Sequence, residues 1–342
     1  MKNRLVYIDA AKGIGIILVI LGHLDKTGQL SREMIYAFHM PFFFFISGLF
    51  VSSSKGFKEY FSDAFKRLYV PFAFFTVLDI IRQIVLNLND FTALEYIKKS
   101  VMSLSGWDYE FIINRPLWFL FALFAVKIAF YVLRKRNFLK LLAVLLGFSF
   151  LFFSKDFKNY YNLYLFAVPG LAFFSLGNMC KPYLKKFDYA VNRKKYIFIP
   201  AVLVSFILFA FTAHKNGSVD MTVYNYGENN LLYIFNALLG SFITLAAAVY
   251  LSKIKLISEP LVFYGKNTMV VLACHYYGCR YIIPDIFNRF GIEKYLYNFY
   301  VDLVLTVVVL AVSALLIWLF NRYLYFIIGL SKPVRKNRQK QD

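Results

Sequence analysis

Long apolar stretches separated by short polar connections dominate the chain. Ten of these stretches come close to the roughly 20 residues that a helix needs to cross a bilayer. They cover residues 6–24, 34–52, 68–88, 117–134, 138–153, 162–179, 196–213, 231–251, 261–283 and 300–330. No alternation typical of a membrane β-barrel strand is present, and a helix satisfies its backbone hydrogen bonds within one segment. The pattern predicts an all-α, polytopic transmembrane bundle of about ten helices.

The lysines and arginines predict the orientation of this bundle. Most of the 39 lie in alternate connections, namely near the N-terminus, in residues 55–67, 134–140, 181–195 and 253–266, and in the C-terminal tail. Connections rich in Lys and Arg stay on the cytoplasmic side of a membrane. We therefore predict that both termini are cytoplasmic. We also predict one membrane domain over residues 1–330 and a basic cytoplasmic tail over residues 331–342.

Composition agrees with a membrane environment. The chain is 60% hydrophobic and 17% charged, with a mean hydropathy of +0.57, whereas a soluble domain carries about 25% charged residues. The net charge of +20 is spread over the connections, where it orients the protein and contacts anionic lipids. A nucleic-acid binder would concentrate its charge in one soluble region. We expect a multi-pass protein of the cell (plasma or inner) membrane, with membrane lipids as partners and without nucleic acid.

The first apolar stretch, "IDAAKGIGIILVILGHL" (8–24), contains Asp9, Lys12 and His23. Each of these ionisable side chains is expensive to bury in hydrocarbon. Eleven residues separate Lys12 from His23, which is about three helical turns and about 16 Å of rise, so both leave the helix from one face. Asp9 lies one turn before Lys12 and can pair with it. We predict a polar stripe that faces the protein interior, where the neighbouring glycines let another helix pack closely.

Two more histidines lie in predicted spans, His39 in 34–52 and His275 in 261–283. The predicted topology places both at the depth of His23, in the outer half of the bilayer, and a shared polar cavity is the economical hypothesis. The alternatives are that each histidine only bonds to a carbonyl and that Lys12 extends toward the cytoplasm. His214, just past the seventh stretch, is interpreted as an ordinary loop residue.

The three cysteines, Cys180, Cys274 and Cys279, lie in apolar surroundings. We expect buried free thiols. The segment "CHYYGC" does not have zinc-site spacing, and one histidine with two cysteines is an incomplete ligand set, so no metal is expected. An acyl-carrying Cys274 is the remaining alternative.

Five segments, in order, resemble the acyltransferase-3 family of integral-membrane acyltransferases. They are "IDAAKGIGIILVILGH", "FHMPFFFFISG", "KRLYVPF", "PLWFLFALF" and "GKNTMVVLACH", starting at residues 8, 38, 66, 116 and 265. The chain is most similar to the fucose 4-O-acetylase-like branch. The family signature is an arginine, ten residues and a histidine. His23 matches it, whereas Lys12 takes the arginine position, which keeps the charge but loses the planar fork.

The resemblance implies transfer of an acyl group, commonly acetyl, from cytoplasmic acyl-CoA to a hydroxyl of a carbohydrate or glycolipid acceptor. Acyl-CoA is then a co-substrate, and no permanently bound cofactor is expected. His23 is the expected general base. Lys12 would stabilise negative charge or grip the pantetheine arm, with Asp9 fixing it. Lys66 and Arg67 are the candidates for binding the CoA phosphates.

Acceptor-binding candidates are His39, His275, Trp118 and Asn267. Either histidine would orient the base or the acceptor. Trp118 would stack on a sugar ring, unless it belongs to the ordinary aromatic belt. Direct transfer and a covalent acyl-His23 intermediate both remain open.

Two other classes of function fit a polytopic bundle. One is a polysaccharide or lipid-linked glycan exporter or permease without acyl transfer, and the other is a non-catalytic partner of a polymer synthase. Transporters often carry internal symmetry and paired broken helices, which this sequence lacks. A non-catalytic partner would leave the polar stripe unexplained.

Overall fold

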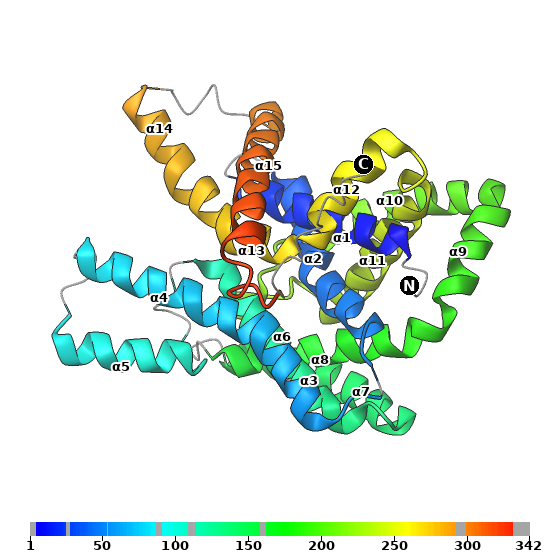
Figure 1. Cartoon of the computed structure of the whole chain (residues 1–342). Coiled ribbons are helices and arrows are strands. Elements are labelled where there is room, and N and C mark those ends of the chain that lie inside the picture. Colours follow the sequence, from blue (N-terminus) through cyan, green and yellow to red (C-terminus); the bar gives the residue numbers. More distant parts are fainter. Residues whose placement is uncertain are drawn as a thin grey trace, which may run out of the picture.

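In a computed structural model the chain forms a bundle of helices (Figure 1). The structure describes residues 5–24, 28–52, 54–86, 91–108, 112, 114–157, 162–291 and 299–330. Over these residues it contains no β-strand, only one isolated bridge between Asp220 and Asn225. The predicted all-α class is therefore confirmed. The predicted tail, residues 331–342, lies outside the described residues.

The first half of the bundle runs through α1 to α8. These helices are α1 (Val6–Gly22), α2 (Gln29–Leu49), α3 (Phe57–Ala64), α4 (Val70–Val85), α5 (Ala93–Leu104), α6 (Trp118–Leu133), α7 (Asn137–Phe153) and α8 (Leu163–Cys180). A π-helical turn, η1 (Phe65–Tyr69), joins α3 to α4, and the 3-10 turns η2 (Arg115–Leu117) and η3 (Ser154–Phe157) begin α6 and follow α7.

The second half runs through α9 to α15. These helices are α9 (Leu184–Arg193), α10 (Lys195–Asn216), α11 (Asn230–Leu251), α12 (Lys255–Lys266), α13 (Thr268–Tyr277), α14 (Ile283–Arg289) and α15 (Phe299–Arg322). The 3-10 turns η4 (Lys181–Tyr183) and η5 (Met221–Val223) precede α9 and α11, and the π-helical turn η6 (Gly278–Ile282) joins α13 to α14.

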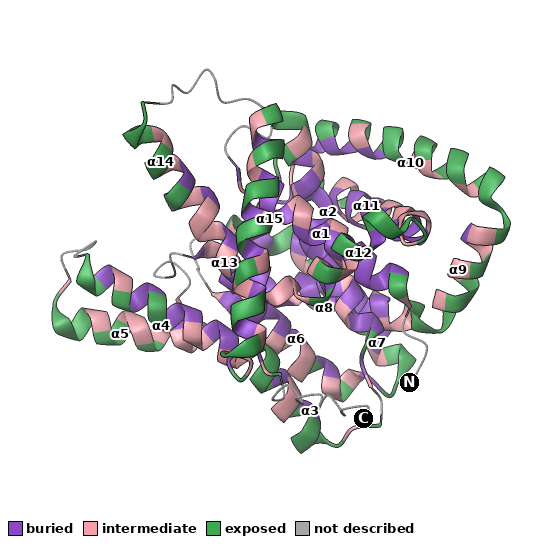
Figure 2. Ribbon diagram, turned by 45° about the horizontal axis from the view of Figure 1, so that its top comes forward, coloured by how far each residue is buried: buried purple, intermediate pink, exposed green. Residues whose placement is uncertain are grey.

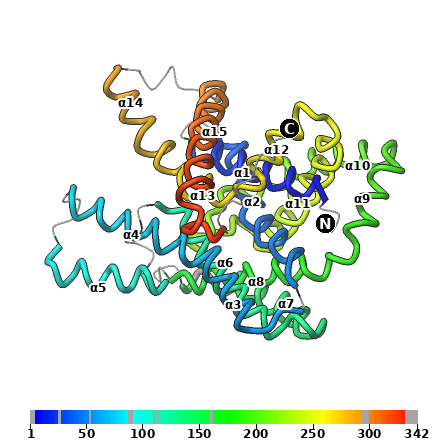
Figure 3. The backbone as a smooth tube through the Cα atoms, in the orientation of Figure 1, coloured from blue at the N-terminus to red at the C-terminus, as the bar shows by residue number. Residues whose placement is uncertain are grey.

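Six helical segments of the described chain are long and apolar enough to cross a membrane. They are Phe57–Val85, Arg115–Leu133, Leu163–Arg193, Lys195–Asn216, Asn230–Leu251 and Phe299–Arg322. The first runs without a break through α3, η1 and α4 (Figure 3). All ten predicted stretches overlap helices of the structure. The number of ten crossings and the cytoplasmic termini stay predictions.

The centre of the bundle is formed by α1, α2, α8 and α11, whose buried residues gather there (Figure 2). Glycines bring their backbones together. A Cβ atom on Gly13 would lie 2.0 Å from the carbonyl oxygen of Leu261 in α12, and one on Gly48 would lie 2.0 Å from that of Phe174 in α8. Only glycine permits such approaches between helices. The predicted close packing around the first helix is confirmed.

The predicted stretch 261–283 is not one uninterrupted α-helix. Asn267 has a non-helical backbone (φ −118°, ψ 22°) and separates α12 from α13. Its side chain supports the interruption, because Nδ2 donates to the carbonyl of Phe263 at 2.8 Å and Oδ1 accepts from Asn321 at 3.1 Å. These bonds satisfy groups that a helix end leaves unpaired. Beyond the interruption, the helical chain continues through η6 to Arg289.

Two amphipathic helices, α5 and α9, were not predicted because neither belongs to an apolar stretch of spanning length. A capping box begins α5, in which Thr92 and Glu95 each bond to the other's backbone N–H. This arrangement satisfies two free donors at the helix start. The helix then packs beside α4 (Figure 1).

Candidate active site

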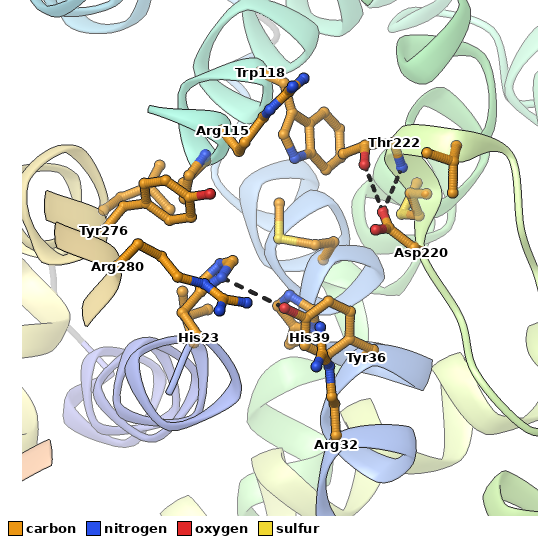
Figure 4. Close-up of a pocket in the computed structure, with 16 residues that line it drawn as sticks. His23, Arg32, Tyr36, His39, Arg115, Trp118, Asp220, Thr222, Tyr276 and Arg280 are labelled. Atoms are coloured by element: carbon orange, nitrogen blue, oxygen red, sulfur yellow. Dashed lines mark hydrogen bonds between the residues drawn. The ribbon is translucent and has the colours of Figure 1, made fainter. Parts of the chain in front are cut away.

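His23 opens into a cavity of about 360 Å³ between α1, α2, η2, η5 and the α13–η6 segment (Figure 4). We call it the histidine cavity. Its ionisable and polar lining residues are His23, His39, Tyr36, Tyr276, Arg32, Arg115, Arg280, Asp220 and Thr222. Trp118, Val19, Met40 and Leu272 contribute apolar wall. Polar groups that converge on a concave space are typical of a ligand site, and this lining is richer in them than most.

His23 lies where α1 ends, at its C-cap position. Its ring centroid is 5.1 Å from that of His275 and 5.4 Å from that of Tyr276. Its Nδ1 lies 3.4 Å from the hydroxyl of Tyr36, which also donates to the carbonyl of Gly22 at 3.3 Å. The imidazole is thus held between two helices while one side faces the cavity.

Backbone carbonyls determine which nitrogen carries the proton in the two neighbouring histidines. His39 Nδ1 bonds to the carbonyl of Ile35 at 2.7 Å, and His275 Nδ1 bonds to that of Val271 at 2.9 Å. Because a carbonyl only accepts, the Nδ1 atoms are the donors, and Nε2 of each neutral ring is an acceptor. Nε2 of His275 is buried and has no hydrogen-bond partner in the described part of the chain. It is therefore an acceptor available beside His23.

The structure brings His23, His39 and His275 together, as the sequence predicted. His23 and His39 line the same cavity, and His275 contacts His23 from behind. Trp118 also lines this cavity; only 4% of it is exposed, and it packs on Phe166 rather than in a lipid-facing aromatic belt.

His214 is not the ordinary loop residue that the sequence suggested. It lies in the last turn of α10, and its Nδ1 contacts the carboxylate of Glu33 at 2.8 Å. Glu33 is buried in α2, and a buried carboxylate needs such a partner. The two residues belong to different predicted connections, so their pairing was not visible in the sequence.

A second, larger cavity of about 890 Å³ contains the other end of the α1 stripe. We call it the basic cavity. Five cations line it, Lys12, Arg67, Lys127, Lys181 and Lys185, and one carboxylate, Asp9. Asp9 is buried, and its Oδ1 lies 3.1 Å from Lys12 Nζ, as predicted from their spacing. Lys12 also lies 4.8 Å from the centre of the Phe50 ring, so its ammonium stays within the protein.

The remaining predicted residues fall outside the cavities or at their margin. Lys66 and Arg67 are both exposed, but only Arg67 lines the basic cavity, and Lys66 lines neither cavity. Asn267 lines neither cavity and supports the interruption between α12 and α13. Cys274 is half-buried and Cys279 is buried, but Cys180 is exposed, so the expectation of three buried thiols was wrong for Cys180.

Leu272 lines both cavities and so lies between them. On α1 the change occurs within one turn, because Ile16 lines the basic cavity and Val19 the histidine cavity. Phe119 and Trp118 show the same change on α6. The polar stripe of α1 therefore has one end in each of two chemically different cavities.

Sequence reasoning missed several residues at these cavities. Lys127 carried a signal, since an ionisable residue inside an apolar span is a candidate functional residue. Lys181 and Lys185 were interpreted only as markers of orientation. The cluster of Arg32, Arg115 and Arg280 had no local signal, because it is assembled from three distant segments.

The sequence model of the acyltransferase-3 family, described as an acyltransferase domain, matches residues 5–322. The chain therefore belongs to this family. The match together with the apolar helices defines a multi-pass membrane acyltransferase. Searches among curated proteins and among solved structures give no match.

Proposed function

We propose that this protein transfers an acyl group, acetyl in the first instance, from cytoplasmic acyl-CoA to a hydroxyl of a cell-surface or lipid-linked carbohydrate. The observation that carries the proposal is the pair of neighbouring cavities that share the lining residue Leu272. The basic cavity is rich in cations. His23 and His39 line the histidine cavity, and His275 lies beside His23. A donor with several phosphates suits the first, and a hydroxyl that needs a base suits the second.

The donor is assigned to the basic cavity. Lys127, Lys181, Lys185 and Arg67 supply positive charge for the CoA phosphates, and Asp9 holds Lys12 at 3.1 Å beside the path of the pantetheine arm. The thioester end then reaches Leu272. Lys12 and His23 are about 16 Å apart along α1, so this path follows the helix from one chamber to the other.

The acceptor is assigned to the histidine cavity, with His23 as the general base. An imidazole nitrogen of His23 takes the proton of the acceptor hydroxyl while the hydroxyl oxygen attacks the thioester carbonyl carbon. The tetrahedral intermediate collapses, the carbon–sulfur bond breaks and an ester forms. The leaving CoA thiolate takes the proton from His23. His39 and His275, each with Nδ1 bonded to a backbone carbonyl, offer acceptor nitrogens that orient the base or the acceptor.

Release of CoA from purified protein tests this proposal. In nanodiscs with radiolabelled acetyl-CoA and a glycan extract, we expect His23→Ala to lower the rate about 10²- to 10⁴-fold, the usual contribution of a general base. His214→Gln is the matched control, because it removes a histidine outside both cavities and keeps a donor for Glu33. We expect it to retain the wild-type rate.

Other outcomes separate the alternatives. Label retained on the wild-type protein but not on His23→Ala would favour a covalent acyl-histidine. Turnover of neither acetyl-CoA nor succinyl-CoA, together with glycan movement across a vesicle membrane, would replace the proposal with transport.

A further inference from the structure

Among the described residues that line the histidine cavity, the three side chains that are cations at every pH are arginines. Arg32 comes from α2, Arg115 from η2 and Arg280 from the π-helical turn η6, and Figure 4 shows their side chains around one space. Asp220 is the carboxylate of this lining, and its Oδ1 accepts hydrogen bonds from the N–H and the hydroxyl of Thr222 at 2.8 and 2.6 Å. Arginines thus outnumber carboxylates among the described residues of this wall.

The placement of these arginines is unusual for the predicted topology. The predicted outer side contains four arginines, namely Arg280 at the end of the stretch 261–283 and Arg32, Arg115 and Arg289 in connections. Three line this cavity, whereas Arg289 is exposed and contacts Asp285 at 2.9 Å. Outer connections of membrane proteins are poor in Lys and Arg, so three arginines gathered at one cavity depart from that pattern.

A buried network fixes the segments that carry two of the arginines. The side chain of Asn114, the residue before Arg115, donates to the carbonyl of Ala273 at 2.6 Å, and its backbone N–H donates to Asp79 Oδ2 at 2.8 Å. The hydroxyl of Tyr277, three residues before Arg280, donates to the same carboxylate of Asp79. Asn114 and Asp79 are both fully buried. The arginine arrangement is thus built by the fold.

We propose that the acceptor of this acyltransferase is an anionic glycan, with a carboxylate or phosphate close to the hydroxyl that receives the acyl group. This inference rests on the proposed function. The arginines bind the anionic group with their planar, bidentate forks and so direct the hydroxyl toward His23. Arginine rather than lysine fits this task, because the fork fixes orientation as well as charge. The volume of about 360 Å³ is in the usual range for such a ligand site.

Methyl glycosides test the proposal in nanodiscs. Methyl β-D-glucoside is compared with methyl β-D-glucuronide and with methyl β-D-glucoside 6-phosphate, by CoA release and by calorimetric binding without donor. We expect at least one anionic glycoside to exceed the neutral one about tenfold or more in kcat/KM and in affinity. The two anionic arms distinguish carboxylate from phosphate. Arg280→Gln should reduce this preference about ten- to hundredfold, in line with a lost charge-assisted hydrogen bond.

Two variants make the result specific. Arg289→Gln removes an arginine outside the cavity and should leave the preference unchanged, whereas Arg280→Lys should retain part of it. Equal or better binding and turnover of the neutral glycoside would overturn the inference. A rise in the KM for acetyl-CoA rather than for the acceptor in Arg280→Gln would also overturn it. Arginine-dependent binding of an anionic glycoside without CoA release from any acceptor would support the inference and overturn the proposed acyl transfer.

Discussion

The two cavities along α1 are both cationic, but they differ in the cations that line them. The basic cavity has four lysines and Arg67, whereas the histidine cavity has three arginines and, among the described residues, no lysine. Lysine is a flexible point charge, and arginine is a planar fork with fixed donors. Flexible charges suit a polyphosphate that enters and leaves in each cycle. Fixed forks suit a ligand whose one hydroxyl must face a base.

In each cavity, one arginine comes from a π-helical turn. The π-helical turn η1 carries Arg67 into the basic cavity, and the π-helical turn η6 carries Arg280 into the histidine cavity. Single π-helical turns within α-helices are frequent at functional sites. Both cavities therefore contain an arginine from a π-helical turn, and the other side chains of each lining make one cavity rich in lysine and the other rich in arginine.

Among changes outside the proposed base His23, filling the space at Leu272 should have the largest effect on acyl transfer. Leu272 is 5% exposed and lines both cavities. We expect Leu272→Trp to lower acyl transfer at least about hundredfold, since a small displacement of reacting groups is enough for such a loss. Binding of acyl-CoA and of the acceptor, measured separately, should each change little. A lower transfer rate with unchanged affinities for acyl-CoA and for the acceptor would show that the acyl group passes Leu272 between the two cavities.

The control for this experiment is Leu272→Met, which conserves volume. Volume-conserving apolar changes usually cost less than about 1.5 kcal/mol of stability, so transfer should persist. Melting of both variants in nanodiscs reports any loss of folding. Full transfer in a folded Leu272→Trp protein would mean that the acyl group takes another route.

Neighbouring lysines sharpen the assignment of the donor. Lys185 lines the basic cavity and Lys186 does not, although both are exposed residues of α9. We expect Lys185→Gln to raise the KM for acyl-CoA up to about fivefold, because an exposed ion pair contributes at most about 1 kcal/mol. Lys186→Gln should leave that KM at its wild-type value. The KM for the acceptor should be the same in both, and equal effects on acyl-CoA would argue against a defined phosphate site.

Much of the first helix could be predicted from the sequence. The spacing of Asp9, Lys12 and His23 fixes a common face, because helix geometry alone determines it. The predicted topology placed His39 and His275 at the depth of His23, and the structure places both rings near His23. The length and apolarity of the stretches predicted an all-α fold, which required no knowledge of packing.

What the sequence did not predict depends on contacts between distant segments. Arg115 and Arg280 are 165 positions apart, and the Asn114–Asp79–Tyr277 network, with packing of η2 against α13, holds their segments at one cavity. The interruption at Asn267 depends on bonds made after folding. In spans that are apolar on every side, periodicity does not indicate which faces meet, so such pairings have no local signature.

The smallest expected effect concerns the residue that departs from the family signature. Lys12→Arg restores the family's arginine, with ten residues between it and His23, and the guanidinium can keep the contact with Asp9 that Lys12 Nζ makes at 3.1 Å. If Lys12 acts by charge on the donor, kcat/KM for acyl-CoA should stay within about twofold, since an effect below about 0.4 kcal/mol is expected when charge is kept. Lys12→Gln, which removes the charge, provides the contrast and should lower that ratio further. A loss in Lys12→Arg as large as in Lys12→Gln would show that the compact ammonium itself is required, which would place its role in the shape of the donor path beside Phe50.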